Sequence, residues 1–454
     1  MPKRLLRNNS GGHVMSKHFS IIFVLLFAVF GPLLSGCDSE DTPTGPEEEK
    51  VQLVYQDWRT DWFPPMTQEM LDEFHAAHPN IQVFYTPDPE NYQDEVLADF
   101  QAGTAPDVFQ GCCTHFPAWA QMGYTLDLRP YVEADLDQSI IDDWNEAQYK
   151  SFITSDGMQF GLPKYHGALA LYYNKDVFDE YGVEYPDDTW DHDDYLDAMK
   201  QLTHDTDGDG QTDLWGSMMD ISWDRVQVRV NAWGGHLVDP DDPARSLMCE
   251  PEAMDAMEWI RARIWDDRVM ASALDVQDLS PRNVFISGQL AMVENGSWAL
   301  KDILDGADFR IGIAPLPAGP AGRATLATTD GFGIYAGTNH PDEAWELVKF
   351  LISKDYGRAM AKANFLQPAR ASLVDEWTGF IQEEFPQEAA GVDLAAFAHG
   401  HIQGYSVTTE IFENMSECKR ITYQAWEEIF TLGQAPVDLM QDVCRQIHEI
   451  HSDS

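Results

Sequence analysis

The feature that most constrains the fold is the order of short apolar strands and amphipathic helices near the start of the chain. Residues 51–55 form a β-rich run, residues 66–77 have helical apolar spacing, and residues 81–85 form a second β-rich run. A further helix over 92–101 and a short strand over 107–110 continue the alternation. Strand, helix and strand in this order are typical of parallel α/β units. The sequence therefore predicts an α/β protein.

The stretch 161–178 predicts a crossing from one domain into another. It begins with a turn-prone Gly-Leu-Pro, passes through polar and aromatic residues, and becomes the apolar run 168–173. An apolar run of this length, placed between a turn signal and helix-starting residues, is typical of a buried strand that opens a new sheet. We therefore expect Tyr165 and His166 to lie at the mouth of a cleft between the two domains.

Residues 1–37 predict a lipoprotein export signal. Four basic residues are followed by the apolar core 21–34, which is short for a membrane span but typical of a signal peptide. Leu-Ser-Gly-Cys then resembles a bacterial lipobox, in which Cys37 is lipidated and becomes the new N-terminus. Such an anchor places the protein outside the cytoplasmic membrane, in the periplasm or on the cell surface, without spanning it. Met1 and Met15 both remain candidate start residues.

Residues 38–50 contain acids, Pro, Gly, Ser and Thr but no hydrophobic side chain, and predict a flexible tether. Beyond the tether the acidic surplus continues along the whole chain, which has 76 Asp and Glu against 29 Lys and Arg and a net charge of −47. A surface of this kind repels nucleic acid, which excludes nucleic acid as a partner. We expect an organism that lives in concentrated salt, which screens the repulsion.

The cysteines match neither a zinc ribbon nor a redox motif. Cys112 and Cys113 are adjacent, whereas Cys249, Cys418 and Cys444 are scattered. Export permits a disulfide, with Cys418 and Cys444 as a candidate pair. Buried thiols are the equal alternative.

Residues 205–216 resemble the calcium loop of an EF-hand. The usual bidentate acid at its last position is replaced by Gly216. A structural calcium ion and an acidic solvated turn are both consistent with this loop, and no other cofactor is expected. The candidate metal ligands are Asp205, Asp207, Asp209, Gln211 and Asp213.

Nine segments along nearly the whole chain resemble one family, in family order. They are 74–83 (FHAAHPNIQV), 102–109 (AGTAPDVF), 161–178, 189–203, 251–260, 285–298 (FISGQLAMVENGSW), 313–323 (IAPLPAGPAGR), 342–354 and 366–370. On these segments the chain resembles family 1 extracellular solute-binding proteins. These are the sugar-binding lipoproteins of ABC importers, and they include the maltose-binding proteins.

The resemblance implies a two-lobed periplasmic-binding-protein fold of type II, with hinge strands and a ligand cleft between two α/β lobes. The first lobe would contain residues 49–164 and 329–367, and the second residues 165–328 and 368–454. Ligand sites at domain interfaces are also the general expectation. We expect a monomer whose partners are a carbohydrate and the membrane permease of the importer.

A sugar site needs aromatic rings for stacking and charged or amide groups for hydrogen bonds. Trp298 aligns with a family tryptophan that stacks on sugar, although a core position is its alternative. Gly167 stands where maltose binders carry a glutamate, so maltose is not the expected ligand. The candidate ligand-binding residues are Trp58, Arg59, Asp107, His115, Tyr165, His166, Trp223, Asp224, Trp298, Asp330 and Tyr405.

The function predicted from these features is capture of a carbohydrate without catalysis, with an oligosaccharide as the expected ligand. One alternative is the same fold with a polyol, glycerol phosphate or peptide as ligand. The few basic residues near the predicted cleft argue against a phosphate. The other alternative is an exported glycoside hydrolase with two carboxylates. Paired carboxylates arise by chance among 76 acids, and the sequence has no serine-hydrolase, zinc-protease or P-loop motif.

Overall fold

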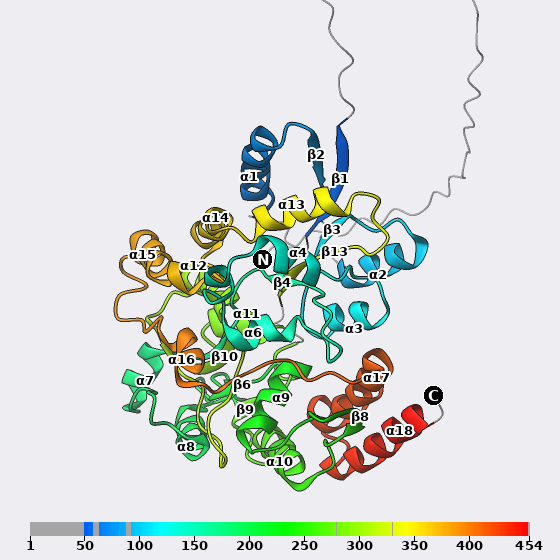
Figure 1. The fold of residues 1–454 in the computed structure, drawn as a ribbon. Coiled ribbons are helices and arrows are strands. Elements are labelled where there is room, and N and C mark those ends of the chain that lie inside the picture. The colour runs from blue at the N-terminus through cyan, green and yellow to red at the C-terminus, as the bar shows by residue number, and fades with distance from the viewer. Residues whose placement is uncertain (1–49, 58–62, 88–91, 278, 329, 453–454) are drawn as a thin grey trace, which may run out of the picture. The chain divides into compact units, whose positions relative to one another are not determined.

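The computed structural model describes residues 50–57, 63–87, 92–277, 279–328 and 330–452 (Figure 1). The chain from Glu49 to Ser454 forms one compact unit. Helices and strands alternate through much of this unit, so the predicted α/β class is confirmed.

A five-stranded sheet organises the first lobe. Its strands, in spatial order, are β2 (Ile81–Tyr85), β1 (Val51–Gln56), β3 (Val108–Gly111), β13 (Gly331–Ile334) and β4 (Leu162–Pro163). β1 pairs in parallel with β2 and β3, whereas β13 runs antiparallel to β3 and β4. Leu53 and Tyr55 of β1 are fully buried and their neighbours are not, because successive side chains of a strand point to opposite faces.

Helices cover this sheet. They are α1 (Phe63–Ala77), α2 (Tyr92–Ala102), α3 (His115–Gln121), α4 (Arg129–Asp135), α5 (Gln138–Ile141), α6 (Glu146–Ser151), α13 (Pro341–Leu351) and α14 (Lys354–Asn364). The apolar stripe of α1, with Leu71 and Phe74, packs in one core with Leu347 of α13 and Met360 of α14. Segments nearly 300 residues apart in the sequence therefore build the same lobe.

A three-stranded antiparallel sheet organises the second lobe, with β5 (Leu169–Asn174) between β10 (Met292–Gly296) and β11 (Ile311–Ala314). All six residues of β5 are buried, which confirms the strand predicted within 161–178. Asn174 ends β5 and accepts hydrogen bonds from the first backbone N–H groups of the next helix, so its side chain starts that helix.

Several helices and small sheets complete the second lobe. The helices are α7 (Lys175–Tyr181), α8 (His192–Leu202), α9 (Trp223–Ala232), α10 (Pro251–Trp265), α11 (Pro281–Ile286), α12 (Leu300–Gly306), α15 (Val374–Glu384), α16 (Ala396–Gln403), α17 (Met415–Trp426) and α18 (Met440–Ser452). The short helices are η1 (Ser297–Ala299), η2 (Ala371–Leu373), η3 (Glu427–Thr431) and η4 (Val437–Leu439). The paired short strands are β6 (Ser217–Met218) with β9 (Met270–Ala271), β7 (Val238–Asp239) with β8 (Asp242–Ser246), and β12 (Thr325–Leu326) with β14 (Ser406–Val407).

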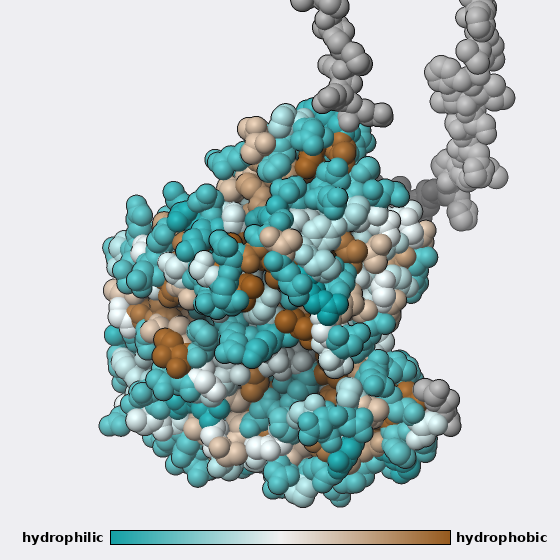
Figure 2. Space-filling view, viewed as in Figure 1, coloured by the Kyte–Doolittle hydropathy of each residue, from teal (hydrophilic) through white to brown (hydrophobic). Residues whose placement is uncertain are grey.

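The chain passes between the two sheets more than once. β4 belongs to the five-stranded sheet and β5 to the three-stranded sheet, and β13 later returns to the first sheet. The residue boundaries predicted for the lobes stay a prediction. Within the described part of the chain, no helix is both long and apolar enough for a membrane span. Hydrophilic residues cover most of the face seen in Figure 2.

The predicted pairing of Cys418 with Cys444 is wrong. The disulfide joins Cys249 to Cys444, with 6.2 Å between their Cα atoms. α18 packs beside β8, and Gln441 of α18 donates to the carbonyl of Cys249 at 3.1 Å, so the two cysteines are held together. Cys418 instead faces the core from α17 as a buried thiol.

Candidate ligand-binding cleft

Polar side chains meet at one edge of the five-stranded sheet, which we call the cleft edge. The carboxyl ends of β1 and β3 and the start of β13 lie there, because β13 runs antiparallel to β3. Lys164 Nζ donates to Asp57 Oδ2 at 2.6 Å and also to Gln110 Oε1. Gln110 Nε2 donates to Asp330 Oδ1 at 3.2 Å. Four side chains from four strand ends therefore form one hydrogen-bonded network, the edge network.

The edge network contains a buried ion pair. The side chains of Lys164 and Asp57 are 1% and 0% exposed, and charges so deeply buried persist only when they are paired. Tyr55 supplies a second donor to the same Asp57 oxygen at 2.8 Å. Of these residues only Asp330 was predicted for the site. The rule that α/β proteins bind ligands beyond the carboxyl ends of strands would also have pointed to Asp57.

Trp298 lies where the two lobes meet. It lies in η1 directly after β10, is partly buried, and contacts hydrophobic clusters of both lobes. A Cβ atom on Gly296 would stand 2.1 Å from the Trp298 ring, so this ring position requires a glycine there. The guanidinium of Arg225 lies 5.9 Å from the ring centre, within the range of a cation–π contact. Arg225 was missed, because its neighbour Trp298 is distant in sequence.

Asp224 precedes Arg225 in the first turn of α9. Its side chain accepts a hydrogen bond from the Thr409 hydroxyl at 2.7 Å. Burial raises the pKa of Asp224, and the Thr409 hydroxyl and the nearby Arg225 charge offset part of that rise. Asp224 therefore supplies a carboxylate that water does not fully solvate, which suits a strong hydrogen bond to a ligand hydroxyl.

The loop after β3 contacts the second lobe through a hydrogen bond. Thr114 accepts a hydrogen bond at 3.0 Å from Nζ of Lys419, which belongs to α17 of the second lobe. Next to Thr114, the thiol of Cys113 donates to Cys112 Sγ at 3.0 Å. That hydrogen bond and then burial raise the pKa of Cys113, and the charges of Asp224 and Asp330 raise it further. Cys113 therefore lies near one acidic residue from each lobe.

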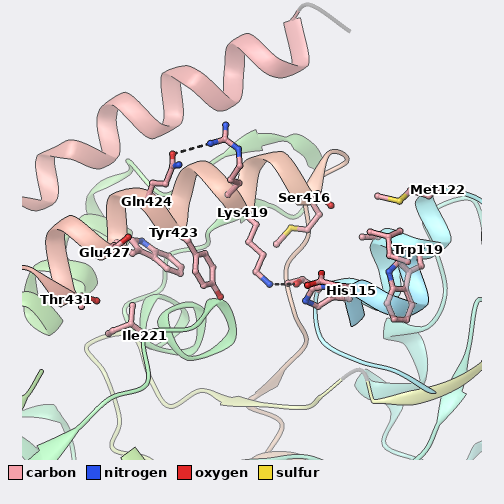
Figure 3. A pocket seen from close by; sticks show the side chains of 17 residues that line it. His115, Trp119, Met122, Ile221, Ser416, Lys419, Tyr423, Gln424, Glu427 and Thr431 are labelled. Atoms are coloured by element: carbon pink, nitrogen blue, oxygen red, sulfur yellow. Dashed lines mark hydrogen bonds between the residues drawn. The ribbon is translucent and has the colours of Figure 1, made fainter. Parts of the chain in front are cut away.

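A cavity of about 650 Å³ lies between α3 and α17. Figure 3 shows Lys419 of α17 reaching toward His115 of α3. Figure 2 shows the surface hollowed between the regions of these two helices. Burial, and to a lesser extent the Lys419 charge, lower the pKa of His115 to about 4. His115 is therefore neutral near pH 7 and can donate or accept one hydrogen bond at each ring nitrogen.

Three predicted residues lie away from this cleft. Trp223 is 1% exposed in the second-lobe core, where its indole N–H donates to the Glu410 carbonyl. Asp107 precedes β3 at the opposite edge of the sheet and accepts from the backbone N–H of Val54 at 2.8 Å. Tyr405 is hydrogen-bonded to His399 within the second lobe. The direction in which each of these side chains points depends on the orientation of its helix or strand, which a sequence motif does not give.

Tyr165 and His166 are buried where the chain leaves the first sheet, and not at an open mouth. The backbone N–H of His166 donates to the carbonyl of Gln367, and its ring lies 6.0 Å from that of His401. Burial, followed by the effect of His401, lowers the pKa of His166 to about 4. The predicted site residues Trp58 and Arg59 lie outside the described residues.

The acidic loop of the second lobe is exposed. Side-chain oxygens of Asp205, Asp207 and Asp209 lie within 4.8 Å of one another, a spacing that one cation could bridge. Asp213 accepts instead from the backbone N–H and the hydroxyl of Thr206 at 2.8 Å. Three of the five predicted ligands therefore lie close together.

The sequence matches a known protein family. The model of the bacterial extracellular solute-binding proteins matches residues 57–358. Among curated proteins, the diacetylchitobiose-binding protein of Streptomyces coelicolor is 25% identical over 308 residues, which cover 66% of this chain and 68% of the relative.

Solved structures share the fold. An ABC substrate-binding protein from Listeria monocytogenes in complex with cycloalternan superimposes with a TM-score of 0.77 at 23% identity, covering 89% of this chain and all of the other. A maltose-bound protein of T. maritima gives a TM-score of 0.68 at 19% identity, covering 88% of this chain and all of the other. The two-lobed architecture predicted from the sequence is therefore confirmed.

Proposed function

Because the chain belongs to the bacterial extracellular solute-binding protein family, we propose that it captures a carbohydrate outside the cytoplasmic membrane and delivers it to an ABC importer. Trp298 stacks on the sugar, and Asp224, Arg225 and Asp330 bind its hydroxyl groups. The protein performs no chemistry on its ligand and acts as a monomer. Its membrane partner is the permease of the importer.

The observation that carries the proposal is the composition of the cleft around Trp298. A partly buried indole ring lies beside the guanidinium of Arg225. The neighbouring Asp224 of the second lobe is partly buried, and Asp330 of the first lobe is 2% exposed. A pyranose ring offers a flat apolar face and a rim of hydroxyl groups, and these groups match such a surface. A sugar-binding protein among the relatives supports the same ligand class.

A sugar panel tests the proposal. The purified protein is mixed with oligosaccharides, and intrinsic fluorescence and melting temperature report binding while chromatography reports products. Trp298→Ala should weaken the binding free energy by about 2 kcal/mol, which is roughly a thirtyfold rise in Kd. The matched control is Trp190→Ala, which removes a partly buried indole packed on Phe178 and should leave Kd unchanged. Release of any sugar product, or equal Kd for parent and Trp298→Ala, would contradict the proposal.

The proposed location depends on Cys37. Lipidation of this residue anchors the protein to the membrane, and Cys37→Ser should release it into the soluble fraction. Incorporation of a radiolabelled fatty acid measures the anchor directly. A soluble parent protein that carries no label would refute this part of the proposal.

A structural calcium ion in the loop formed by Asp205, Asp207 and Asp209 belongs to the same proposal. The closeness of the three carboxylates supports it, because calcium prefers oxygen ligands of this kind. Life in concentrated salt is the proposed reason for the net charge of −47, since salt screens repulsion among exposed carboxylates.

A further inference from the structure

Two adjacent cysteines directly follow β3, the middle strand of the five-stranded sheet. Cys112 is buried and Cys113 is partly buried, and their sulfur atoms lie 3.0 Å apart, within about 1 Å of the length of a disulfide bond. Cys113 has a φ angle of 54°, a left-handed conformation that is uncommon for a residue with a side chain. The backbone thus turns both thiols toward each other.

We infer that Cys112 and Cys113 form a vicinal disulfide in the exported protein. Exported proteins mature where disulfides form and persist. The same chain already holds one disulfide, between Cys249 and Cys444. The sulfurs of Cys112 and Cys113 need to approach each other by only about 1 Å to reach bonding distance.

The oxidant is a disulfide of the cell envelope, either on a thiol–disulfide oxidoreductase or on a small molecule. The thiolate of one cysteine attacks this disulfide and releases one thiol. The second cysteine then displaces the mixed disulfide, so that the Cys112–Cys113 bond forms and the second thiol leaves. One S–S bond breaks and one forms. The two protons and two electrons lost by the protein reduce the oxidant to two thiols.

The vicinal disulfide changes the cleft surface. Cys113 lies near Asp224 of the second lobe and Asp330 of the first, and its neighbour Thr114 contacts Lys419 across the cleft. Oxidation replaces two S–H groups by a rigid, apolar ring of sulfur and backbone atoms at this point. A ligand that enters between the lobes then meets a surface that cannot donate hydrogen bonds from sulfur.

The vicinal bond opens more easily than the other disulfide. Adjacent Cα atoms are about 3.8 Å apart, which is shorter than the roughly 4.4–6.8 Å usual for a disulfide. The Cα atoms of Cys249 and Cys444 are 6.2 Å apart, inside that range. Strained disulfides have more oxidising potentials and are the labile ones. Rising dithiothreitol should therefore reduce the Cys112–Cys113 bond first.

Mass spectrometry of the full-length protein, exported with its own leader, tests the inference. Cells are quenched with acid, and the protein is alkylated in denaturant without reductant and digested with trypsin. The fragment 60–150 contains Cys112 and Cys113 and no other cysteine. It should be lighter than its dithiol form by two hydrogen atoms and carry no alkyl group. Alkylation of both residues before reduction would overturn the inference.

The single substitution Cys113→Ser provides the control for a different modification. It should leave Cys112 as a thiol that takes up one alkyl group, and a blocked Cys112 in this variant would overturn the vicinal assignment. A dithiothreitol titration that opens the Cys249–Cys444 bond at the lower concentration would refute the predicted lability. None of these masses depends on a ligand, so the outcome is separate from that of the sugar panel.

Discussion

Replacing Lys164 by methionine tests how the buried edge network stabilises the first lobe. Lys164→Met keeps a long unbranched side chain but leaves the Asp57 carboxylate, which is 0% exposed, without its cation. Removing one partner of a buried ion pair costs about 3–5 kcal/mol. Gln110 also loses a donor, whereas Tyr55 still donates to Asp57 at 2.8 Å. We therefore expect the free energy of unfolding to fall by about 4 kcal/mol. For the compact unit of Glu49–Ser454 this corresponds to a fall of about 5 °C in Tm.

Urea and thermal unfolding measure this loss. The double variant Asp57→Asn/Lys164→Met has no unpaired buried charge and should recover most of it, since neutral replacements for buried pairs are well tolerated. Lys150→Met is the matched control: its ion pair with Glu146 is exposed, with side chains 67% and 79% accessible, and its removal should leave stability unchanged. Measurements in concentrated salt separate the two pairs, because salt screens only exposed charges effectively. A loss below about 1 kcal/mol for Lys164→Met would refute the reasoning.

Three further predictions concern the second lobe and the hinge. The pKa of His166 is about 4 in the folded protein and about 6.5 when unfolded, so the unfolded chain binds more protons between these values and the protein loses stability as pH falls from 6.5 to 4. His166→Phe should lose less stability over this interval in urea titrations, and equal pH dependence would contradict the prediction. The disulfide between Cys249 and Cys444 spans 195 residues, and Cys249→Ser should lower the unfolding free energy by about 5 kcal/mol; an unchanged urea midpoint would show that the bond does not stabilise the fold. A chelator should lower the Tm of the parent and leave that of Asp205→Ala unchanged, and calcium binding by the loop is refuted if neither protein responds.

Local patterns predicted much of the fold. The strands and helices of the first hundred residues of the globular part follow alternating or helical apolar spacing, and β5 follows from its unbroken apolar run. These features depend on neighbours in the sequence and so appear in the sequence itself. The family resemblance then supplied the two-lobed arrangement, which periodicity alone does not specify.

The cleft was harder to predict because its contacts are long-range. Lys419 and Thr114 are 305 residues apart, and no local sequence pattern predicts the hydrogen bond between them. Trp223 and Asp224 are adjacent on α9, yet the first is buried in the core and the second is only partly buried. A shift of one residue turns a helical side chain by about 100°, so a motif that marks the right helix turn still leaves the ligand-facing residue open.

The position of β13 determines the order in which this protein can fold during export. β13 lies between β3 and β4, and β4 has no other strand as a partner within the described sheet. As the chain emerges with its N-terminus first, β4 leaves the membrane long before Gly331 does. Until β13 emerges, β3 and β4 of the first lobe lack the strand that pairs between them, while the second lobe's central strand β5 and its partners emerge. A translocation intermediate that ends before residue 331 would expose this edge to pairing with other chains.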